Sequence, residues 1–410
     1  MRKSGIRGFI MVLLAVFAVL TGIQTGSESV RAAGQNADLA GAKSTIIQAY
    51  KRYQTQVDVS QYQLYNNRDD AAVSQIMTEV VNQTPGLFYT GMQFSKYVVV
   101  GTNQIKAIKL EYANSFCNAD GSVNISKIRK VQSQIRSQVK KAMKGIKSSM
   151  SPLEKALVLH DYLIKNTQYL EDESKEYRYS EWGVFLKGKA NCQGYSLAYG
   201  ILMQEAGIPV RYVVSEEMLH MWNQIKIGGK WYHVDVTWDD PLDTRLKKDQ
   251  YGLVLHDRFL CSTQKMTEKG YYGFQAKSAK STKYDNKFWT EINSEIFYRK
   301  GKWLYQTDQR IEQRTSLVKG KAKTLYWAGG VYFTSLDKNR YYFINYNRIY
   351  LYYRKTQKMY LVLDGNKRYK GKTTINQLKY DSGKLTYRVV KDDRVKTVSK
   401  RINKKGLLAK

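Results

Sequence analysis

The sequence predicts an α+β protein followed by a separate all-β module, and three observations support this. Between Cys192 and Trp238, one helical pattern is followed by three short extended segments, an order typical of α+β folds. From about Tyr284 onward, short alternating strands with Gly, Asp and Asn turns dominate. The length of 410 residues exceeds what one core supports, because single cores stop growing near about 250–300 residues. We therefore expect more than one folded unit.

Residues 1–32 have the layout of an export signal. The basic start MRKSGIR precedes the apolar run GFIMVLLAVFAVLTGI, and small residues follow between Val30 and Ala33. The alternative is an uncleaved membrane anchor, but this run of about 16 residues is shorter than the ~20 that a spanning helix needs. We expect cleavage after Ala32 and a secreted, extracellular protein, associated with the cell envelope if its basic part binds there.

Residues 36–150 are expected to form an N-terminal α/β region that leads into the core. Its helical patterns lie at 43–53, 71–81 and 122–146, and its strand-like runs lie at 96–101 and 105–113. The third helical pattern is basic and amphipathic. Its basic face is more typical of solvated surface than of membrane binding.

Residues 151–280 are expected to form the core that carries the chemistry. Ser151, Pro152 and Glu154 indicate a capped start for the helix PLEKALVLHDYLIKN. His160 lies three or four residues from apolar positions on that helix, so we interpret it as a packed rather than a catalytic histidine.

The second helical pattern of the core, QGYSLAYGILMQEAG, ends at Gly207. The segments VRYVVS, HMWNQIKIG and KWYHVDVTW follow as strands. Gly228 and Gly229 between the last two predict a tight hairpin turn.

Residues 286–410 are expected to form the basic, Tyr-rich all-β module, as a sandwich, a barrel or a few propeller-like blades. The chain has a net charge of +32, and its last 130 residues hold 31 basic and 10 acidic side chains. For an exported protein, anionic wall polymers or a membrane surface are the natural partners, and we expect no nucleic acid. The alternative is a basic surface that only keeps the protein soluble.

Three cysteines are too few for a disulfide scaffold in a chain of this length. Cys117 and Cys261 could bridge each other or remain buried thiols, and the sequence leaves both possibilities open. Cys192 differs because it lies at the start of a predicted helix, where backbone N–H groups and the helix dipole stabilise a thiolate. The same N–H groups, including that of Cys192, would face the oxyanion of a tetrahedral intermediate. Gly194 would let a substrate backbone approach closely.

His220 and Asp235 are the expected base and the group that orients it. A two-residue turn at Gly228 and Gly229 sets Trp222 opposite Asp235, which places His220 one diagonal step away on the same face. Asp235 would accept from one imidazole nitrogen and leave the other for Cys192. Taken singly, each of the three residues has an ordinary structural interpretation.

Two competing interpretations involve the same segment. His233 could replace His220 as the base, but it lies beside Asp235 on one strand rather than across from it. A zinc site built from Cys192, His220 and Asp235 would lack any CxxC or HxxxH pair, so we expect no metal and no cofactor.

The segments NCQGYSLAYGILMQEAGIP, HMWNQIKIGGKWYHVDVTWDDP and RFLCST resemble the bacterial transglutaminase-like superfamily, of the papain-related Cys-His-Asp kind and the secreted, Gram-positive type. Together with the helix at 152–166, the resemblance covers about a third of the chain. It implies a papain-like core in which a Cys-bearing helix packs on an antiparallel sheet. By this resemblance Cys192 is the nucleophile, His220 the base and Asp235 the orienter.

The resemblance also implies acyl transfer or hydrolysis at peptide or glutamine amide bonds through a thioester, with a protein or peptide as substrate. Candidates for the oxyanion site or substrate groove are Trp182, Gln193, Gly194 and Trp222, and a packing role for Trp182 is equally compatible with the sequence. Family members include cross-linkers, peptidases, amidases and inactive proteins. The alternative function is therefore a non-catalytic wall- or peptide-binding protein with the same fold.

Overall fold

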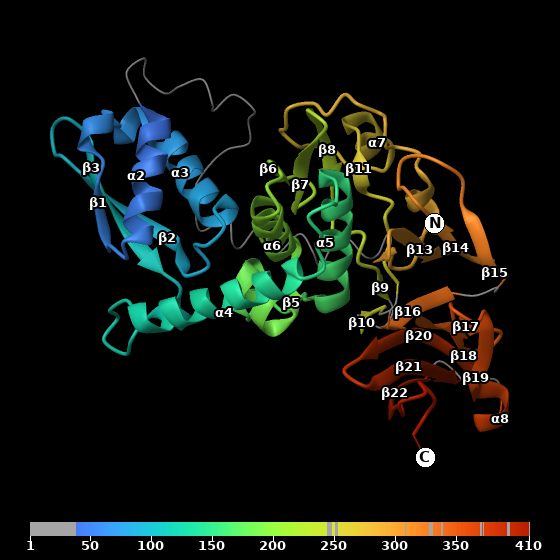
Figure 1. Cartoon of the computed structure of the whole chain (residues 1–410). Helices are drawn as coiled ribbons and strands as arrows, with labels where there is room; N and C mark the ends of the chain where they lie inside the picture. The colour runs from blue at the N-terminus through green and yellow to red at the C-terminus, as the bar shows by residue number, and fades with distance from the viewer. Residues whose placement is uncertain are drawn as a thin grey trace. The chain divides into compact units, whose positions relative to one another are not determined.

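The computed structural model describes residues 38–243, 248–250, 253–307, 309–327, 331–337, 339–369, 371, 373–391 and 394–409 (Figure 1). The predicted export signal at 1–32 lies outside these residues. None of the helices within the described ranges has the length and apolar character needed to cross a membrane. The contacts within the chain divide it into two compact units. The first takes in Met1–Lys141, Leu170–Ile201 and Val214–Met221, and the second takes in Ala142–Tyr169, Leu202–Val213 and Trp222–Lys410.

The N-terminal part of the first unit combines three helices with one small sheet. The helices are α2 (Leu39–Lys51), α3 (Asn66–Gln83) and α4 (Ile125–Met143), and the strands are β1 (Gln56–Asp58), β2 (Thr90–Val98) and β3 (Ile105–Tyr112), with short 3₁₀ turns at Ser60–Tyr62 and Asn114–Phe116. The strands pair antiparallel in the order β1-β3-β2. The three helices and the strand predicted at 105–113 are confirmed, with bounds that shift by a few residues. The strand predicted at 96–101 begins earlier and ends at Val98, and β1 was not predicted.

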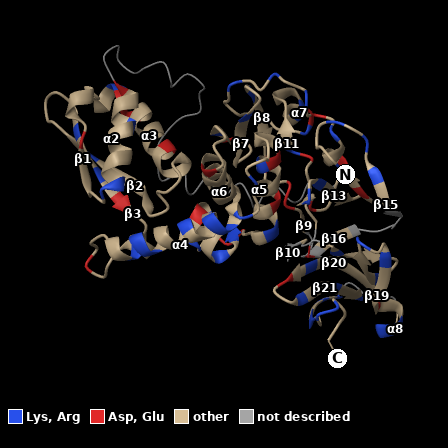
Figure 2. Ribbon diagram, in the orientation of Figure 1, with Lys and Arg blue, Asp and Glu red and all other residues tan. Residues whose placement is uncertain are grey.

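The buried positions of helix α4 explain its amphipathic pattern. Its buried positions are Ile128, Val131, Ile135 and Val139, spaced by three or four residues. Its other face carries exposed Lys and Arg without any Asp or Glu, as Figure 2 shows.

The region between α4 and the β-rich part contains the elements that carry the predicted site. These are α5 (Pro152–Asn166), β4 (Gln168–Tyr169), a 3₁₀ turn (Glu176–Tyr179), a π-helical turn (Gly183–Lys187), β5 (Lys189–Ala190), α6 (Cys192–Glu205), β6 (Val210–Ser215), β7 (His220–Ile227), β8 (Lys230–Val234), β9 (Leu242–Asp243), β10 (Lys248–Asp249), β11 (Phe259–Cys261), α7 (Thr263–Glu268) and a 3₁₀ turn (Phe288–Glu291). The main sheet has the order β11-β8-β7-β6. Helix α5 begins with the predicted capping box of Ser151 and Glu154.

The β7–β8 hairpin has the predicted register. Ile227 faces Lys230 and Asn223 faces Val234. Gly228 and Gly229 form the turn with φ of 56° and 78°, values that glycine adopts without strain. Extending this register by one residue sets Trp222 opposite Asp235, as predicted from the sequence.

The predicted strand over Lys230–Trp238 is too long. Strand β8 ends at Val234, and Thr237 and Trp238 instead donate their N–H groups to Asp235 Oδ1, at 3.0 and 3.1 Å. The ladder ends here because the carboxylate takes the amides that a longer strand would have offered to a neighbour.

The β-rich part consists of three antiparallel meanders. The first contains β12 (Phe297–Arg299), β13 (Lys302–Gln306), β14 (Arg310–Arg314) and β15 (Lys323–Trp327), the second β16 (Val331–Asp337), β17 (Arg340–Asn345), β18 (Arg348–Tyr353) and β19 (Lys358–Asp364), and the third β20 (Thr373–Asp381), β21 (Lys384–Lys391) and β22 (Arg394–Arg401), with one helical turn, α8 (Gly365–Arg368). Strands β12 and β13 form a hairpin, and so do strands β17 and β18.

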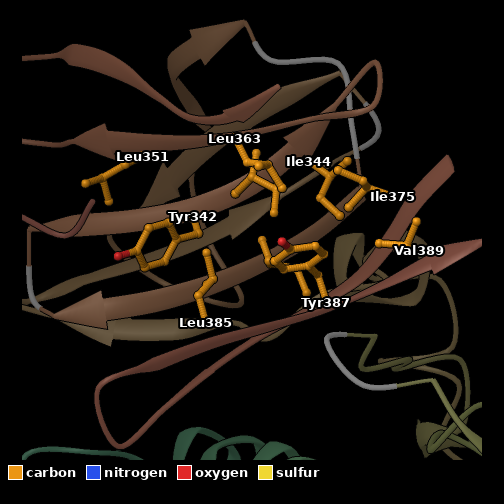
Figure 3. Packing of buried hydrophobic residues seen from close by; sticks show 10 residues of the cluster. Tyr342, Ile344, Leu351, Leu363, Ile375, Leu385, Tyr387 and Val389 are labelled. Carbon is orange, nitrogen blue, oxygen red and sulfur yellow. The ribbon is translucent and has the colours of Figure 1, made fainter. Parts of the chain in front are cut away.

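The second and third meanders share an apolar layer (Figure 3). It includes Ile344, Leu351 and Leu363 from one sheet and Leu385 and Tyr387 from the other. All five side chains are less than a tenth exposed. Strand β17 is buried on both faces, because its even-numbered residues Tyr342 and Ile344 enter this layer while Tyr341 and Phe343 belong to a second buried cluster that includes residues of the first meander.

The β-rich part also contacts helix α5 of the same unit. The indole N–H of Trp303 donates to Glu154 Oε1 at 3.1 Å, and Lys379 Nζ donates to the carbonyl of Lys165 at 3.0 Å. These contacts attach the first and third meanders to the two ends of α5.

Candidate active site

Cys192 is the first residue of α6, and Asn191 caps the helix that it begins. Asn191 Oδ1 accepts from the N–H of Gly194 at 3.2 Å, and the Asn191 N–H donates to the carbonyl of Arg178 at 2.9 Å. The Cys192 side chain is buried, with 7% of its surface exposed. Asn191 was not singled out from the sequence, although an Asn directly before a helical pattern is a typical capping signal.

Gly194 has a different role from the one predicted. A Cβ built there would lie 2.7 Å from the carbonyl oxygen of Arg178 and 3.0 Å from that of Ser180. Gly194 therefore permits the close approach of the protein's own backbone, whereas the sequence predicts the approach of a substrate backbone.

Ser196 joins the helix that carries Cys192 to the strand that carries His220. Its Oγ lies 2.8 Å from the carbonyl oxygen of Cys192 and 2.9 Å from that of Met221, so its proton can serve either oxygen. Met221 directly follows His220, which begins β7 and is 6% exposed. The starts of α6 and β7 are consequently adjacent.

Asp235 is fully buried directly after β8. Besides the N–H groups of Thr237 and Trp238, its carboxylate accepts from the hydroxyl of Tyr271, which lies 2.5 Å from Oδ2. Burial, followed by the nearby negative charge of Asp235, raises the pKa of Tyr271. Tyr271 therefore acts as a donor to an acceptor-only carboxylate. No sequence spacing pointed to Tyr271.

Cys192 and His220 belong to the first unit, and Asp235 belongs to the second. The assembly of all three into one triad thus stays a prediction.

His233, the alternative base, is buried and fully engaged. Its Nδ1 accepts from the indole N–H of Trp222 at 2.9 Å, and its Nε2 lies 3.0 Å from Thr263 Oγ1. Burial and, to a smaller extent, the charge of Arg211 lower the pKa of His233 to about 3. A neutral ring with both nitrogens occupied is not suited to hold a thiolate.

Trp222 is buried rather than part of an open groove. Only 1% of it is exposed, and its ring contacts Tyr271 and Phe274 at centroid distances of 5.0 and 5.2 Å. Its place is therefore in the core beneath Asp235, which corrects the assignment to a substrate groove.

The two remaining groove candidates contact other parts of the first unit. The ring of Trp182 packs edge-on against Phe116 and Tyr177, at centroid distances of 5.0 and 5.8 Å. Gln193 Nε2 donates to Asn82 Oδ1, at the C-terminal end of α3, at 3.3 Å. These contacts support a packing role for Trp182 and link the N-terminal helices to the first turn of α6.

All three cysteines are free thiols, so the possible bridge between Cys117 and Cys261 is not formed. Burial raises the pKa of both Cys117 and Cys261. Neither has the environment of a reactive thiolate.

A second group of titratable side chains lies inside the second unit. His160 and Asp161 on α5 contact Asp239 and His256, and all four are buried. Burial opposes the charged form of His160, but hydrogen bonds to Asp161 and Asp239 outweigh this and raise its pKa to about 9. The prediction that His160 is a packed residue is confirmed.

The core combines an α-helix that begins with a cysteine and an antiparallel sheet that carries a buried His, with a buried Asp directly after one of its strands. Residues 139–236 match the model of the Transglutaminase-like superfamily, and they include Cys192, His220 and Asp235. This segment is thus similar to a superfamily whose members are typically cysteine enzymes. The predicted family resemblance is confirmed for this segment.

Two solved structures show weak similarity to the chain. One, described as a TGase, is 16% identical, with 39% of this chain and 46% of that chain covered and a TM-score of 0.25. The other, named "Putative Cysteine Protease from Cytophaga hutchinsonii", is 14% identical, with 35% and 61% covered and a TM-score of 0.22. The chain thus spans less than two thirds of the length of either. No curated protein matches it.

Proposed function

We propose that the protein is an exported cysteine enzyme that transfers or hydrolyses the acyl group of peptide or glutamine-type amides at the cell envelope. Cys192 attacks the amide carbonyl as a thiolate, and His220 donates its proton to the departing amine. A thioester forms, and an amine or water then attacks it and releases Cys192. Asp235 orients His220 and stabilises its charged form.

The observation that carries this proposal is the bridge at Ser196. A single hydroxyl within 2.9 Å of the carbonyls of Cys192 and Met221 fixes the first turn of α6 against the first residues of β7. The nucleophile and the base then occupy the ends of two elements that are held together by a buried contact. In this proposal the backbone N–H groups of the first turn of α6, other than the N–H of Gly194 that Asn191 caps, stabilise the oxyanion.

The nucleophile is tested by labelling the full chain with an electrophilic glutamine-amide analogue. We expect Cys192→Ala to abolish labelling, while Cys117→Ala and Cys261→Ala keep it, since those thiols lie outside the proposed site. Intact-protein mass spectrometry measures the adduct, and circular dichroism reports the fold. Equal labelling of wild type and Cys192→Ala would rule out Cys192 as the nucleophile.

The acyl acceptor is tested separately. A glutamine-containing peptide is incubated with and without a primary amine, and the products are separated by mass. Amine incorporation supports cross-linking, whereas free acid with released ammonia, or a cleaved peptide bond, supports hydrolysis. A protein that labels at Cys192 but turns over none of these substrates would favour the binding alternative.

Export is tested by the form of the protein found outside the cell. The full chain expressed in a Gram-positive host should appear in the medium or wall fraction with Ala33 as its first residue. A chain that stays in the cytoplasm, or stays in the membrane with its first residues intact, contradicts the proposed export.

A further inference from the structure

Three buried side chains of the second unit converge on one point. His160 Nδ1 lies 3.0 Å from Asp161 Oδ1, and His256 Nε2 lies 2.9 Å from the same oxygen. One ligand atom from each residue lies within 4.8 Å of the others, and all three residues are buried. Such a set of two imidazole nitrogens and one carboxylate oxygen has the donor atoms that bind transition-metal ions.

The outer nitrogen of each histidine already has an acceptor. His160 Nε2 lies 3.1 Å from Asp239 Oδ2, and His256 Nδ1 lies 3.0 Å from the carbonyl oxygen of Ile292. Asp239 also accepts from the N–H of Arg258, so its carboxylate is an acceptor. Both outer nitrogens therefore carry a hydrogen.

When both rings are neutral, only one nitrogen of each carries a hydrogen, so His160 Nδ1 and His256 Nε2 present lone pairs to Asp161 Oδ1 at 3.0 and 2.9 Å. These lone pairs repel one another unless positive charge lies between them. Two added protons or one divalent cation supply that charge, beside the guanidinium of Arg258, which lies 3.9 Å from Asp239.

The arrangement around the histidines favours the cation. Metal-bound histidines nearly always donate their outer N–H to a carboxylate or a backbone carbonyl, and this cluster contains one of each. The second oxygen of Asp161 is held by the N–H of Ile296 at 2.9 Å, which orients the first toward the histidines.

We propose that His160, Asp161 and His256 bind one divalent transition-metal ion, with Zn²⁺ the best match to two nitrogens and one oxygen. Because the three residues are shielded from solvent, the ion serves the fold. It joins α5 to the segment before β11. Asp161 contacts Ile296 and His256 contacts Ile292, so the ion also supports the connection that leads into β12. No step of the proposed acyl transfer uses it.

The test measures zinc in the full chain, purified without chelator and with its affinity tag removed. We expect close to one zinc ion per chain in the wild type and in His233→Gln, a buried histidine outside the cluster. His256→Gln and His160→Gln should lose the ion, because each removes one ligand. Cys192→Ala should keep it, so that failure of the acyl-transfer proposal leaves this result unchanged.

Two measurements on the wild type keep the test decisive if the cluster variants do not fold. Reconstitution with Co²⁺ should give the visible absorption of a bound ion, and Zn²⁺ should raise the thermal unfolding midpoint relative to a chelator. Wild-type protein without stoichiometric zinc, without the Co²⁺ spectrum and with an unchanged midpoint overturns the proposal in favour of a network held by protons. Zinc that persists in folded His256→Gln overturns it as well.

Discussion

At the scale of single residues, the hydroxyl of Tyr271 fixes one oxygen of Asp235 while backbone amides fix the other. The Tyr271 ring is itself held between Trp222 and Trp238, at centroid distances of 5.0 and 4.7 Å. Asp235 therefore has little freedom to rotate. A carboxylate that orients a histidine needs this kind of support.

We expect Tyr271→Phe to lower the free energy of unfolding by about 1–3 kcal/mol, because it leaves a buried carboxylate oxygen without this donor. If Asp235 orients His220 as proposed, the rate at which the amide analogue labels Cys192 should also fall, since the carboxylate is then less constrained. Urea unfolding and labelling kinetics measure the two effects. Tyr272→Phe is the matched control, because that side chain is 55% exposed. Equal effects of the two substitutions would contradict this role of Tyr271.

Glu181 is a buried carboxyl in the first unit. Its Oε1 accepts from the N–H of Gly86 at 2.7 Å, and its buried Oε2 has no hydrogen-bond partner among the described residues. Burial raises the pKa of Glu181 to about 7. The neutral acid is thus the form that the folded protein favours.

The contribution of Glu181 to the free energy of unfolding should consequently fall as the pH rises from about 4.5 to about 7, because in this window the folded state binds a proton that the unfolded state has released. The lowered pKa of His233 acts with the opposite sign as the pH rises from about 3 to about 6.5, so the effect of Glu181 is the difference between wild type and variant. Glu181→Gln should remove this contribution and raise the free energy of unfolding above pH 7 by roughly 3 kcal/mol. Urea titrations across the window measure it. An identical slope in the variant would show that another group is responsible.

At the scale of elements, the first turn of α6 brings several contacts together. Asn191 caps it, the missing side chain of Gly194 lets the backbone of 178–180 approach, and Ser196 contacts β7. The helix start is therefore held on three sides, which suits a nucleophile that must keep one position.

We expect Ser196→Ala to lower the free energy of unfolding by about 1–2 kcal/mol and to slow labelling of Cys192, since the link between α6 and β7 is lost. Ser151→Ala is the matched control, because it removes the capping box of α5 at a similar cost to stability. Only Ser196→Ala should change the labelling rate at a pH where both proteins are folded. A similar decrease for both would mean that loss of stability alone explains it.

Most elements could be predicted because their patterns are local. The helices at 152–166 and 192–205 and the β7–β8 hairpin follow from apolar spacing, a capping box and two adjacent glycines. The end of β8 could not be predicted in this way. Asp235 is followed by the strand-like residues Val236 and Thr237, and its carboxylate overrides their propensity by binding two amides.

At the scale of the whole molecule, exposed positive charge occurs on more than one element. The edge strand β22 carries exposed basic residues, and so does the outer face of α4 (Figure 2). Lys and Arg on an edge strand discourage pairing with other chains, which is the ordinary structural explanation. Binding of anionic wall polymers is the functional one.

The structural and the functional explanation predict different results when positive charge is removed from one surface at a time. If the C-terminal part localises the protein, Lys396, Lys400 and Arg401 changed together to Glu should weaken binding to purified teichoic acid, a phosphate-backbone wall polymer. The matched control changes Lys127, Lys130 and Lys140 on α4 to Glu, which lowers the net charge by the same amount. Binding of the wild type should weaken with added salt because screening shortens the reach of exposed charges. Equal loss in both variants would indicate that net charge alone matters.

The sequence by itself determined the order of the elements, the identity of Cys192, His220 and Asp235 as candidates, and the similarity of residues 139–236 to the transglutaminase-like superfamily. These depend on spacing along the chain. Only the tertiary structure showed that Ser196 joins α6 to β7, that Tyr271 holds Asp235, and that His160 and His256 meet at Asp161. The reason is physical: these contacts join residues 25 to 95 positions apart, and packing, not local propensity, brings such residues together.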